Sequence, residues 1–183
     1  MYGFYPQTVI GGLRSAIAIE RSRNARRGIS WWTWENRLTR YAVSLVASYV
    51  FVAAVFGPFG LLFHVTQGVL GFSILEVINY VEHYGLARAE VSPGRFEKVQ
   101  PRHSWNANHR VSNWWLFNLQ RHADHHANAS RPFWNLRAIE EGPQLPFSYP
   151  VAILVAMVPP LWMSIMDPRV REQNDQSELI AAK

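Results

Sequence analysis

The chain has 183 residues, enough for one ordinary domain, and it contains no cysteine. Disulfides and cysteine-ligated zinc or iron–sulfur centres are therefore excluded. The formal net charge of +5 is unevenly placed, because residues 1–40 carry seven arginines against Glu20 and Glu35 while residues 41–183 are balanced. Such a basic block could bind nucleic acid, but it directly precedes a long apolar run. That position favours an arginine-rich segment on the cytoplasmic side of a membrane.

The first two segments predict a membrane anchor. Residues 1–37 form a basic cytoplasmic or interfacial segment, whose Trp31-Trp32-x-Trp34 cluster is typical of an aromatic belt at a membrane surface. Residues 41–56 carry no charge and, with their flanks, are long enough to cross a hydrocarbon core as a helix. After the turn Gly57-Pro58-Phe59-Gly60 a second long segment follows. Residues 38–87 are therefore predicted to form a transmembrane helical hairpin, with a buried hairpin of a soluble protein as the alternative.

The second helix of this hairpin carries a polar stripe. On a helical wheel Glu76, Asn79 and His83 fall within about 40° of one another. Ionisable groups at membrane depth are costly and normally face the interior of a bundle, so the stripe is a candidate functional site. A structural hydrogen bond is an equally good interpretation of Glu76 alone. His64 lies on another face, and we interpret it as a structural histidine.

A histidine cluster lies further along the chain. His122, His125 and His126 are three and four residues apart, so on a helix their imidazoles would project toward one point. Imidazole suits iron, copper, nickel and zinc, although a histidine-rich surface turn would read the same way. His83 is the best additional ligand, since the polar loop between it and the cluster is long enough to fold back. Residues 88–149 are therefore predicted to be a cytoplasmic metal-site region.

The C-terminal part is predicted to be peripheral. Residues 150–166 are apolar, but Pro159-Pro160 interrupts them, which favours an interfacial or re-entrant helix over a straight span. Residues 167–183 form a polar tail that we expect to be disordered.

Several stretches resemble one enzyme family. The segment Asn79-Tyr80-Val81-Glu82-His83-Tyr84-Gly85-Leu86 and the run Leu119-Gln120-Arg121-His122-Ala123-Asp124-His125-His126-Ala127 are similar to motifs of integral-membrane alkane hydroxylases, the alkane 1-monooxygenases. These enzymes belong to the wider membrane desaturase and hydroxylase superfamily, and the Glu-His-Tyr-Gly motif is what narrows the resemblance. The remaining similar segments are His103 to His109, Arg131, Leu136-Arg137 and Met166-Asp167-Pro168.

The resemblance implies an all-α membrane helical bundle with a cytoplasmic-side histidine-rich helix, in the inner membrane of a bacterium. It implies a di-iron centre that uses O₂ to hydroxylate the terminal methyl group of an alkane to a primary alcohol. Electrons would come from NAD(P)H through a reductase and a rubredoxin. No binding motif for a nucleotide cofactor is present in the sequence.

The resemblance also implies roles for single residues. The ligands would be His83, His122, His125 and His126. Neutral imidazoles suit a buried site because they bind iron without burying several carboxylates. Residues that could support the ligands through hydrogen bonds are Glu82, Asp124, His109 and Asn79. For Glu82 and Asp124 an exposed salt bridge is an equally good interpretation, and we expect His103 to be structural.

One departure from the family limits these expectations. The family has two further histidine boxes upstream, and this chain has no histidine before His64. The matched region therefore corresponds to the C-terminal half of a family member, which we expect to be unstable and inactive alone and to need the missing N-terminal half as its partner. Two alternatives remain: a catalytically incomplete membrane remnant that binds at most one metal, or a related aryl-methyl hydroxylase or lipid desaturase.

Overall fold

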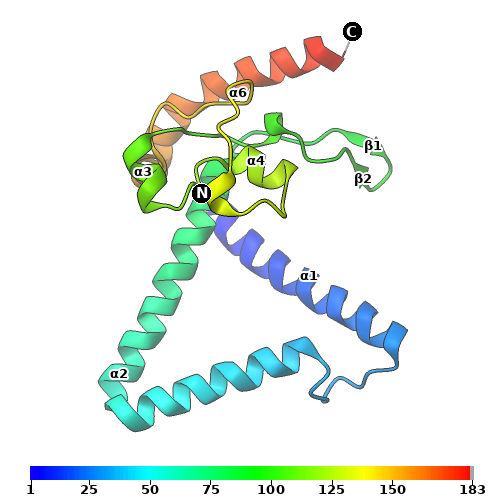
Figure 1. Ribbon diagram of the computed structural model, residues 1–183, viewed down its shortest axis with the longest axis vertical. Helices are drawn as coiled ribbons and strands as arrows, with labels where there is room; N and C mark the ends of the chain where they lie inside the picture. Colours follow the sequence, from blue (N-terminus) through cyan, green and yellow to red (C-terminus); the bar gives the residue numbers. More distant parts are fainter. Residues whose placement is uncertain (182–183) are drawn as a thin grey trace. The chain divides into compact units, whose positions relative to one another are not determined.

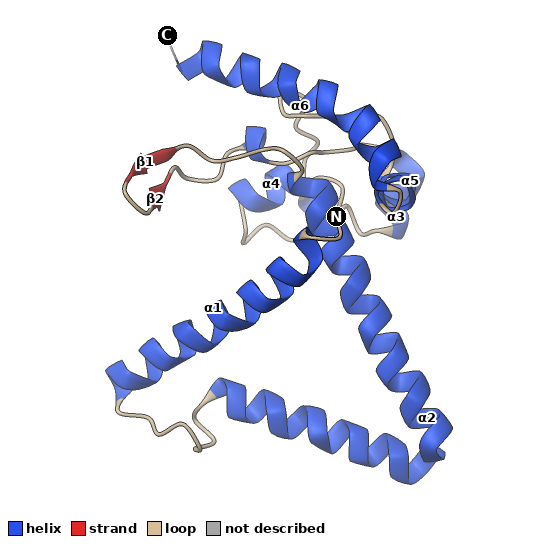
Figure 2. Cartoon of the chain, turned by 180° about the vertical axis from the view of Figure 1, so that it is seen from behind, coloured by secondary structure: helices blue, strands red, loops and turns tan. Residues whose placement is uncertain are grey.

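A computed structural model describes residues 1–181 and shows a mostly helical fold, which confirms the predicted all-α class (Figure 1; Figure 2). The helices are α1 (Phe4–Arg27), α2 (Arg37–His83), α3 (Arg110–Trp115), α4 (His122–Ala127), α5 (Tyr149–Ala156) and α6 (Pro159–Ala181). Two short 3₁₀ turns, η1 (Pro101–His103) and η2 (Phe133–Asn135), lie in the connections. The strands β1 (Glu90–Ser92) and β2 (Arg95–Phe96) form an antiparallel hairpin in which Glu90 pairs with Phe96.

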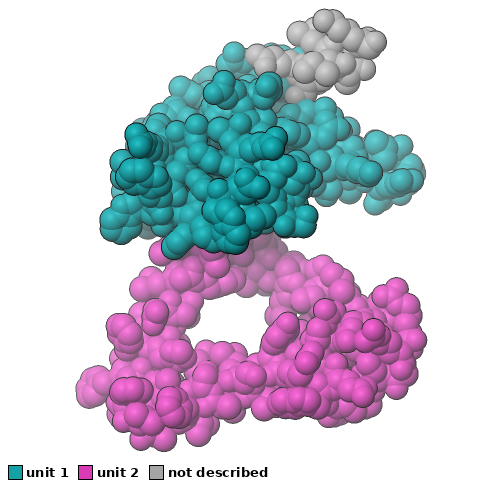
Figure 3. Space-filling view, in the orientation of Figure 1, with its two compact units in different colours: residues 1, 77–183 teal, residues 2–76 magenta. Residues whose placement is uncertain are grey.

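The chain divides into two compact units inside α2 (Figure 3). Unit 2 covers residues 2–76, with α1 and most of α2. Unit 1 covers residues 77–183 together with Met1, and it contains the end of α2 and all later elements. All eight residues predicted to ligate the metal or to support its ligands lie in unit 1.

Helix α2 has the properties of a membrane span. Its best 18-residue window has a mean hydropathy of 2.1, and none of that window is buried inside the protein. Gly57 interrupts the helix with a φ of 69° and a ψ of −170°, and Pro58 follows it. The interruption lies at the turn that the sequence predicts. Close to it, the ring of His64 packs edge-on against Tyr49, with centroids 5.7 Å apart.

Unit 1 has a small aromatic core. Trp105, Tyr149, Trp162 and Met166 are almost fully buried and come from the loop after β2, from α5 and from α6. Val81 of α2 lies in the same core with no exposed surface. This core brings Val81, near the C-terminal end of α2, together with residues that follow it by 24 to 85 positions in the chain.

The C-terminal region differs from the prediction. Residues 150–166 are divided between α5 and α6, because Pro159-Pro160 occupies the first turn of α6, where proline is tolerated. Helix α6 then continues through Pro168 to Ala181, so the expectation of disorder is wrong for residues 167–181. A tertiary contact joins the beginning of this stretch to the end of α2, since the hydroxyl of Tyr84 donates to Oδ1 of Asp167 at 2.6 Å. Residues 182–183 of the predicted tail lie outside the described residues.

Candidate metal centre

The end of α2 is fixed by the loop that follows β2. The last carbonyls of a helix need partners from outside it, and Trp105 supplies two. Its backbone N–H donates to the carbonyl of Glu82 at 2.8 Å, and its indole N–H donates to the carbonyl of Tyr84 at 2.7 Å. Gly85 then ends the helix in the left-handed region, with a φ of 69°. His83 is therefore held on a rigid, capped helix end.

Helix α4 is held by a side chain from outside its own sequence. The residue before it, Arg121, makes no capping bond, but Oδ1 of Asn106 accepts the N–H of Ala123 at 2.8 Å. Asn106 is buried, and its amide nitrogen donates to the carbonyl of Ser104 at 2.9 Å. A borrowed cap of this kind can order a six-residue helix that would be marginal alone. It sets the position of His122 and His126.

Three imidazoles meet between these two helix ends. One ring nitrogen from each of His83, His122 and His126 lies within 4.8 Å of the others. The Nε2 atoms of His122 and His126 are 2.7 Å apart, and the ring of His83 lies 5.2 Å and 5.3 Å from theirs, centroid to centroid. Nitrogens that converge in this way can share one cation at the usual bond lengths of about 2.0–2.1 Å for an imidazole ligand.

The hydrogen bonds of the rings select the nitrogens that can bind a metal. Nδ1 of His83 lies 3.0 Å from the carbonyl oxygen of His103, which can only accept, so Nδ1 carries a proton and Nε2 is the nitrogen left to bind a metal. Nδ1 of His122 lies 3.1 Å from Oε1 of Glu82, off the direction of a hydrogen bond, and neither buried atom has another partner among the described residues. The carboxylate still faces Nδ1, which leaves Nε2 of His122 toward the cluster.

The charge state of the cluster suits a metal. Burial, followed by the neighbouring charges of His126, His83 and His125, lowers the pKa of His122 to about 3. Burial and the nearby His83 also lower the pKa of His126. Both rings are therefore neutral at physiological pH and need not lose a proton before they bind a cation.

A solvent-accessible cavity of about 340 Å³ leads to two of the three imidazoles. Arg88 at its wall adds a positive charge at the approach to the histidines. The lining residues are His83, Leu86, Arg88, Val99, His103 and His126. A small molecule or an ion can therefore reach His83 and His126 from outside the protein.

His125 lies outside this cluster. Its side chain is exposed, and its ring is 6.1 Å from that of His122 and 5.9 Å from that of His126. The structure thus gathers three of the four predicted ligands and leaves the fourth on the rim of α4.

Asp124 hydrogen-bonds to the loop after α4, and no contact with a histidine nitrogen is among its described interactions. Both of its oxygens lie 2.6 Å from the guanidinium of Arg131, while it also accepts from the backbone N–H of Arg137 and the amide of Asn128. Burial would raise the pKa of Asp124, but these hydrogen bonds and the Arg131 charge outweigh it and lower the pKa. The residue is buried, so its ion pair with Arg131 is not the exposed salt bridge that the sequence allowed.

The other predicted residues take different places. Both ring nitrogens of His103 are engaged, since Nδ1 accepts the N–H of Gln100 and Nε2 faces Glu97, each at 3.0 Å. The expectation that His103 is structural fits these contacts, although its carbonyl also orients His83. His109 is exposed and uses its backbone carbonyl to begin α3, and Asn79 is half-buried on α2.

Residues that sequence reasoning missed hold the site together. Besides Trp105 and Asn106, Gln120 is fully buried, and its Oε1 accepts the N–H of Tyr149 at 2.9 Å. The Tyr149 hydroxyl donates to the carbonyl of Trp105 and lies beside Glu82, and burial with that negative charge raises its pKa. These residues show no periodicity, and only their proximity to the histidine motifs in sequence could have suggested a role.

Residues 1–154 match the fatty acid desaturase family. The match covers most of the chain, so the chain belongs to this family. Within it, the chain is 46% identical over 171 residues to an alkane 1-monooxygenase of Acinetobacter baylyi and 43% identical over 172 residues to alkane 1-monooxygenase 2 of Pseudomonas aeruginosa. The hydroxylase component of a xylene/toluene monooxygenase of Pseudomonas putida is 29% identical over 177 residues. The family resemblance seen in the motifs is confirmed.

These matches cover nearly all of this chain but less than half of each relative. They cover 93%, 93% and 96% of this chain, but 42%, 45% and 46% of the respective relatives. The chain therefore spans less than half the length of the curated proteins that it matches.

Proposed function

We propose that this chain forms part of a membrane non-haem iron monooxygenase that hydroxylates the terminal methyl group of an alkane to a primary alcohol. The convergence of His83, His122 and His126 carries the proposal, in a chain that is 46% identical to an alkane 1-monooxygenase. A cluster of neutral nitrogens at the end of a candidate membrane helix is what such a site needs.

The donor set fits iron. Imidazole nitrogens suit Fe²⁺, and the protonated Nδ1 of His83 directs the other ring nitrogen toward the metal position. Iron bound there would supply the activation of O₂. The three clustered imidazoles can hold one ion, so a di-iron centre requires His125 to turn inward and further ligands from the part of the relatives that this chain does not span.

The residues of this chain would then position the site and admit its reactants. Glu82 and the carbonyl of His103 orient two of the ligands, and Trp105 fixes the helix end that bears His83. Because His83 is the last residue of α2, an apolar substrate dissolved in the bilayer would reach the site along that helix. We place the site on the cytoplasmic side of the inner membrane, where rubredoxin and an NAD(P)H-dependent reductase would deliver electrons.

A second candidate changes the substrate and keeps the chemistry. The 29% identity to the hydroxylase component of a xylene/toluene monooxygenase favours an aryl-methyl substrate as the alternative. The higher identity to alkane 1-monooxygenases favours the alkane. A remnant that binds at most one metal and does no catalysis is the remaining alternative.

A chimeric enzyme tests the proposal. The segment of the Acinetobacter baylyi alkane 1-monooxygenase that aligns with this chain would be replaced by residues 1–183, and membranes would be supplied with a rubredoxin, its reductase and NADH. We expect oxidation of octane or hexadecane to the 1-alcohol and iron bound at about two ions per chimera. Product analysis by gas chromatography with xylene in parallel separates the alkane from the aryl-methyl hypothesis.

Matched variants of the chimera locate the activity. His122→Ala should abolish both iron binding and alcohol formation, while His109→Ala, which removes an exposed imidazole outside the cluster, should retain both. A chimera that folds and binds two irons but oxidises no hydrocarbon would contradict the proposed function. One that binds a single labile ion would favour the remnant.

A further inference from the structure

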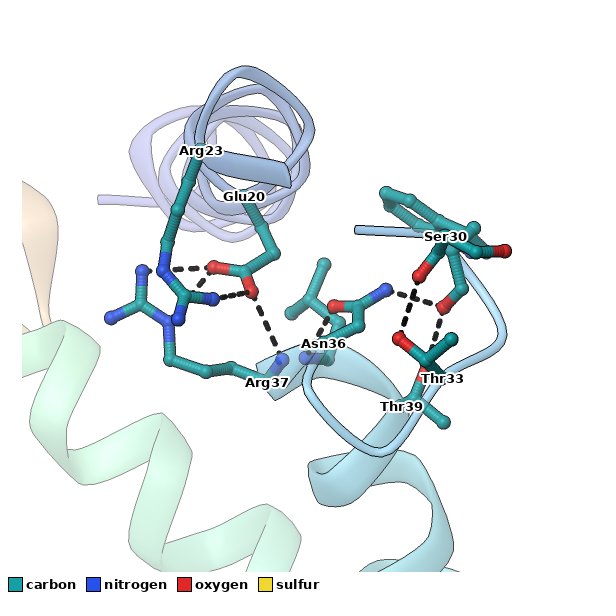
Figure 4. Close-up of polar contacts among 9 residues, drawn as sticks. Glu20, Arg23, Ser30, Thr33, Asn36, Arg37 and Thr39 are labelled. Atoms are coloured by element: carbon teal, nitrogen blue, oxygen red, sulfur yellow. Dashed lines mark hydrogen bonds and ion pairs between the residues drawn. The ribbon is translucent and has the colours of Figure 1, made fainter. Parts of the chain in front are cut away.

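A buried carboxylate joins α1 to the beginning of α2. Glu20 of α1 is 3% exposed and receives an N–H from the side chain of Arg23 at 2.6 Å (Figure 4). Arg37 donates to it twice, from its backbone N–H at 2.9 Å and from its side-chain Nε at 2.8 Å. Burial would raise the pKa of Glu20, but the bonds from Arg37 and Arg23 outweigh it and lower the pKa. The ionised carboxylate therefore fastens the two helices to each other.

The connection between the helices is equally well ordered. Gly28 ends α1 in the left-handed region, and the N–H of Ile29 returns to the carbonyl of Asn24 at 3.0 Å. Asn36, which is fully buried, donates to the carbonyl of Trp31 at 2.6 Å and accepts the N–H of Leu38 at 3.0 Å (Figure 4). The connection between α1 and α2 is thus held in one conformation by its own hydrogen bonds.

The end of α1, the connection and the beginning of α2 line an open basic pocket of about 460 Å³. Its charged lining consists of Arg23, Arg27 and Arg40 with one carboxylate, that of Glu35. Arg23 shares Glu20 with Arg37, so the four arginines and two glutamates of the cluster keep a net charge of +2. Arg27 and Arg40 have no carboxylate partner among the residues whose contacts the structure describes. The charge of the pocket is therefore complementary to that of an anion.

The connection that supplies part of the pocket lining also carries exposed tryptophans. Trp32 and Trp34 are 84% and 64% exposed, although indole rings are usually well buried in water-soluble domains. Both lie in the connection that leads directly into α2, the candidate membrane span. Exposed indoles next to arginines at the beginning of an apolar helix are typical of the headgroup layer of a bilayer.

We propose that the pocket lined by Arg23, Arg27 and Arg40 binds the phosphate of an anionic phospholipid headgroup. Guanidinium groups match phosphate oxygens in bidentate geometry, and juxtamembrane arginines are attracted to acidic lipids. Glu20 keeps Arg23 and Arg37 in place, so that little order has to be created when the lipid binds. The acyl chains of the same lipid would lie against Trp32, Trp34 and the apolar surface of α2.

A nucleic acid is the other polyanion that could bind arginines. The observations favour the lipid, because the pocket is limited to a few arginines and its lining includes the connection that bears the exposed tryptophans and leads into an apolar helix. A nucleic-acid surface would instead present an extended row of cations along a groove. The experiment therefore compares a lipid with a nucleic acid.

Native mass spectrometry of the full chain in detergent micelles measures the proposed binding. Phosphatidylglycerol and phosphatidylcholine of equal acyl length are added in parallel, with inorganic phosphate and a short RNA as further probes. We expect retention of phosphatidylglycerol with an affinity about tenfold or more above that of phosphatidylcholine. Inorganic phosphate and RNA should neither bind tightly nor displace the lipid.

Charge-matched variants locate the site. Arg27→Gln with Arg40→Gln should remove the preference for phosphatidylglycerol, whereas Arg14→Gln with Arg21→Gln, at exposed positions of α1 outside the pocket lining, should leave it intact. Glu35→Gln should strengthen lipid binding, a gain that misfolding cannot produce. Equal losses in the two arginine pairs, an unchanged Glu35→Gln, or displacement of the lipid by RNA would overturn the proposal.

Discussion

Nδ1 of His83 donates a hydrogen bond of 3.0 Å to the carbonyl oxygen of His103, a residue twenty positions later in the chain. The His103 ring is itself fixed between the N–H of Gln100 and the carboxylate of Glu97. This chain of contacts fixes the tautomer of His83 and the direction of its metal-binding nitrogen. His103 therefore belongs to the metal centre as a positioning residue, although its own imidazole binds no metal.

Replacing His103 tests this relationship. His103→Ala frees the segment that presents the carbonyl, so we expect the affinity of the chain for Fe²⁺ to fall about tenfold or more. The dissociation constant would be measured anaerobically by competition with a chromophoric chelator. His109→Ala removes an exposed histidine of the same loop and should leave the constant unchanged. Equal constants for the two variants would show that the contact to His83 does not orient the ligand.

Glu82 offers a second test of ligand orientation. Its Oε1 faces Nδ1 of His122 at 3.1 Å, and a carboxylate in that place increases the basicity of a metal-bound imidazole. Glu82→Gln keeps the shape but can no longer face a metal-bound His122 as a carboxylate, so we expect Fe²⁺ affinity to fall about tenfold. The same chelator competition measures it, with Glu140→Gln at an exposed position as the control. An unchanged affinity in Glu82→Gln would assign the carboxylate a purely structural role.

The sequence predicts the histidine site only in part, and helix geometry explains why. His122 and His126 are four residues apart and lie about 40° from each other around the helix, so they share a face. His125 lies about 100° from His126, so on the six-residue helix α4 it lies on a different face. The sequence spacing does not distinguish the three histidines, whereas only those on the face of α4 that is turned toward His83 can contact it.

The elements around the site could be predicted where the signal is local. The turn at Gly57 and the apolar segments of α2 follow from composition and from glycine and proline. By contrast, the hydrogen bond from Tyr84 to Asp167 of α6 and the cap that Asn106 provides at Ala123 of α4 could not be predicted from local signals. Such contacts join residues 17 and 83 positions apart, and no periodic pattern records them.

The buried ion pair of Asp124 predicts a pH dependence of stability. Because the folded pKa of Asp124 is lowered, its ion pair with Arg131 is fully stabilising above the unfolded value of about 4 and is lost as the pH falls through the folded pKa. Asp124→Asn should lower the free energy of unfolding at neutral pH by about 2 kcal/mol.

Chemical unfolding in mixed micelles, followed by circular dichroism over a series of pH values, measures both effects. The difference between the wild type and Asp124→Asn should shrink as the pH falls below about 4, because protonation of Asp124 breaks the same ion pair. Glu140→Gln, at an exposed position, should leave the stability at neutral pH unchanged. A difference that stays constant with pH would mean that the ion pair with Arg131 does not stabilise the loop.

The glycine of the Glu-His-Tyr-Gly motif predicts the sharpest effect on packing. Gly85 has a φ of 69°, and a Cβ there would lie 2.5 Å from Cγ1 of Val170 on α6. Gly94 has a similar φ of 74° but open space around it, so it is the matched control. Gly94→Ala should cost about 1–2 kcal/mol of stability for the left-handed backbone alone. Gly85→Ala should cost clearly more, because the clash adds to the same backbone term.

A double-mutant cycle isolates the clash. Val170→Ala removes the atoms that a Cβ at position 85 would meet, so Gly85→Ala should be less destabilising in the Val170→Ala background than in the wild type. Unfolding followed by circular dichroism gives the four free energies. If Gly85→Ala and Gly94→Ala cost the same, the close approach of α6 to the end of α2 would not exist in solution. The motif glycine would then serve the turn alone, and the helix end that bears His83 would be held without α6.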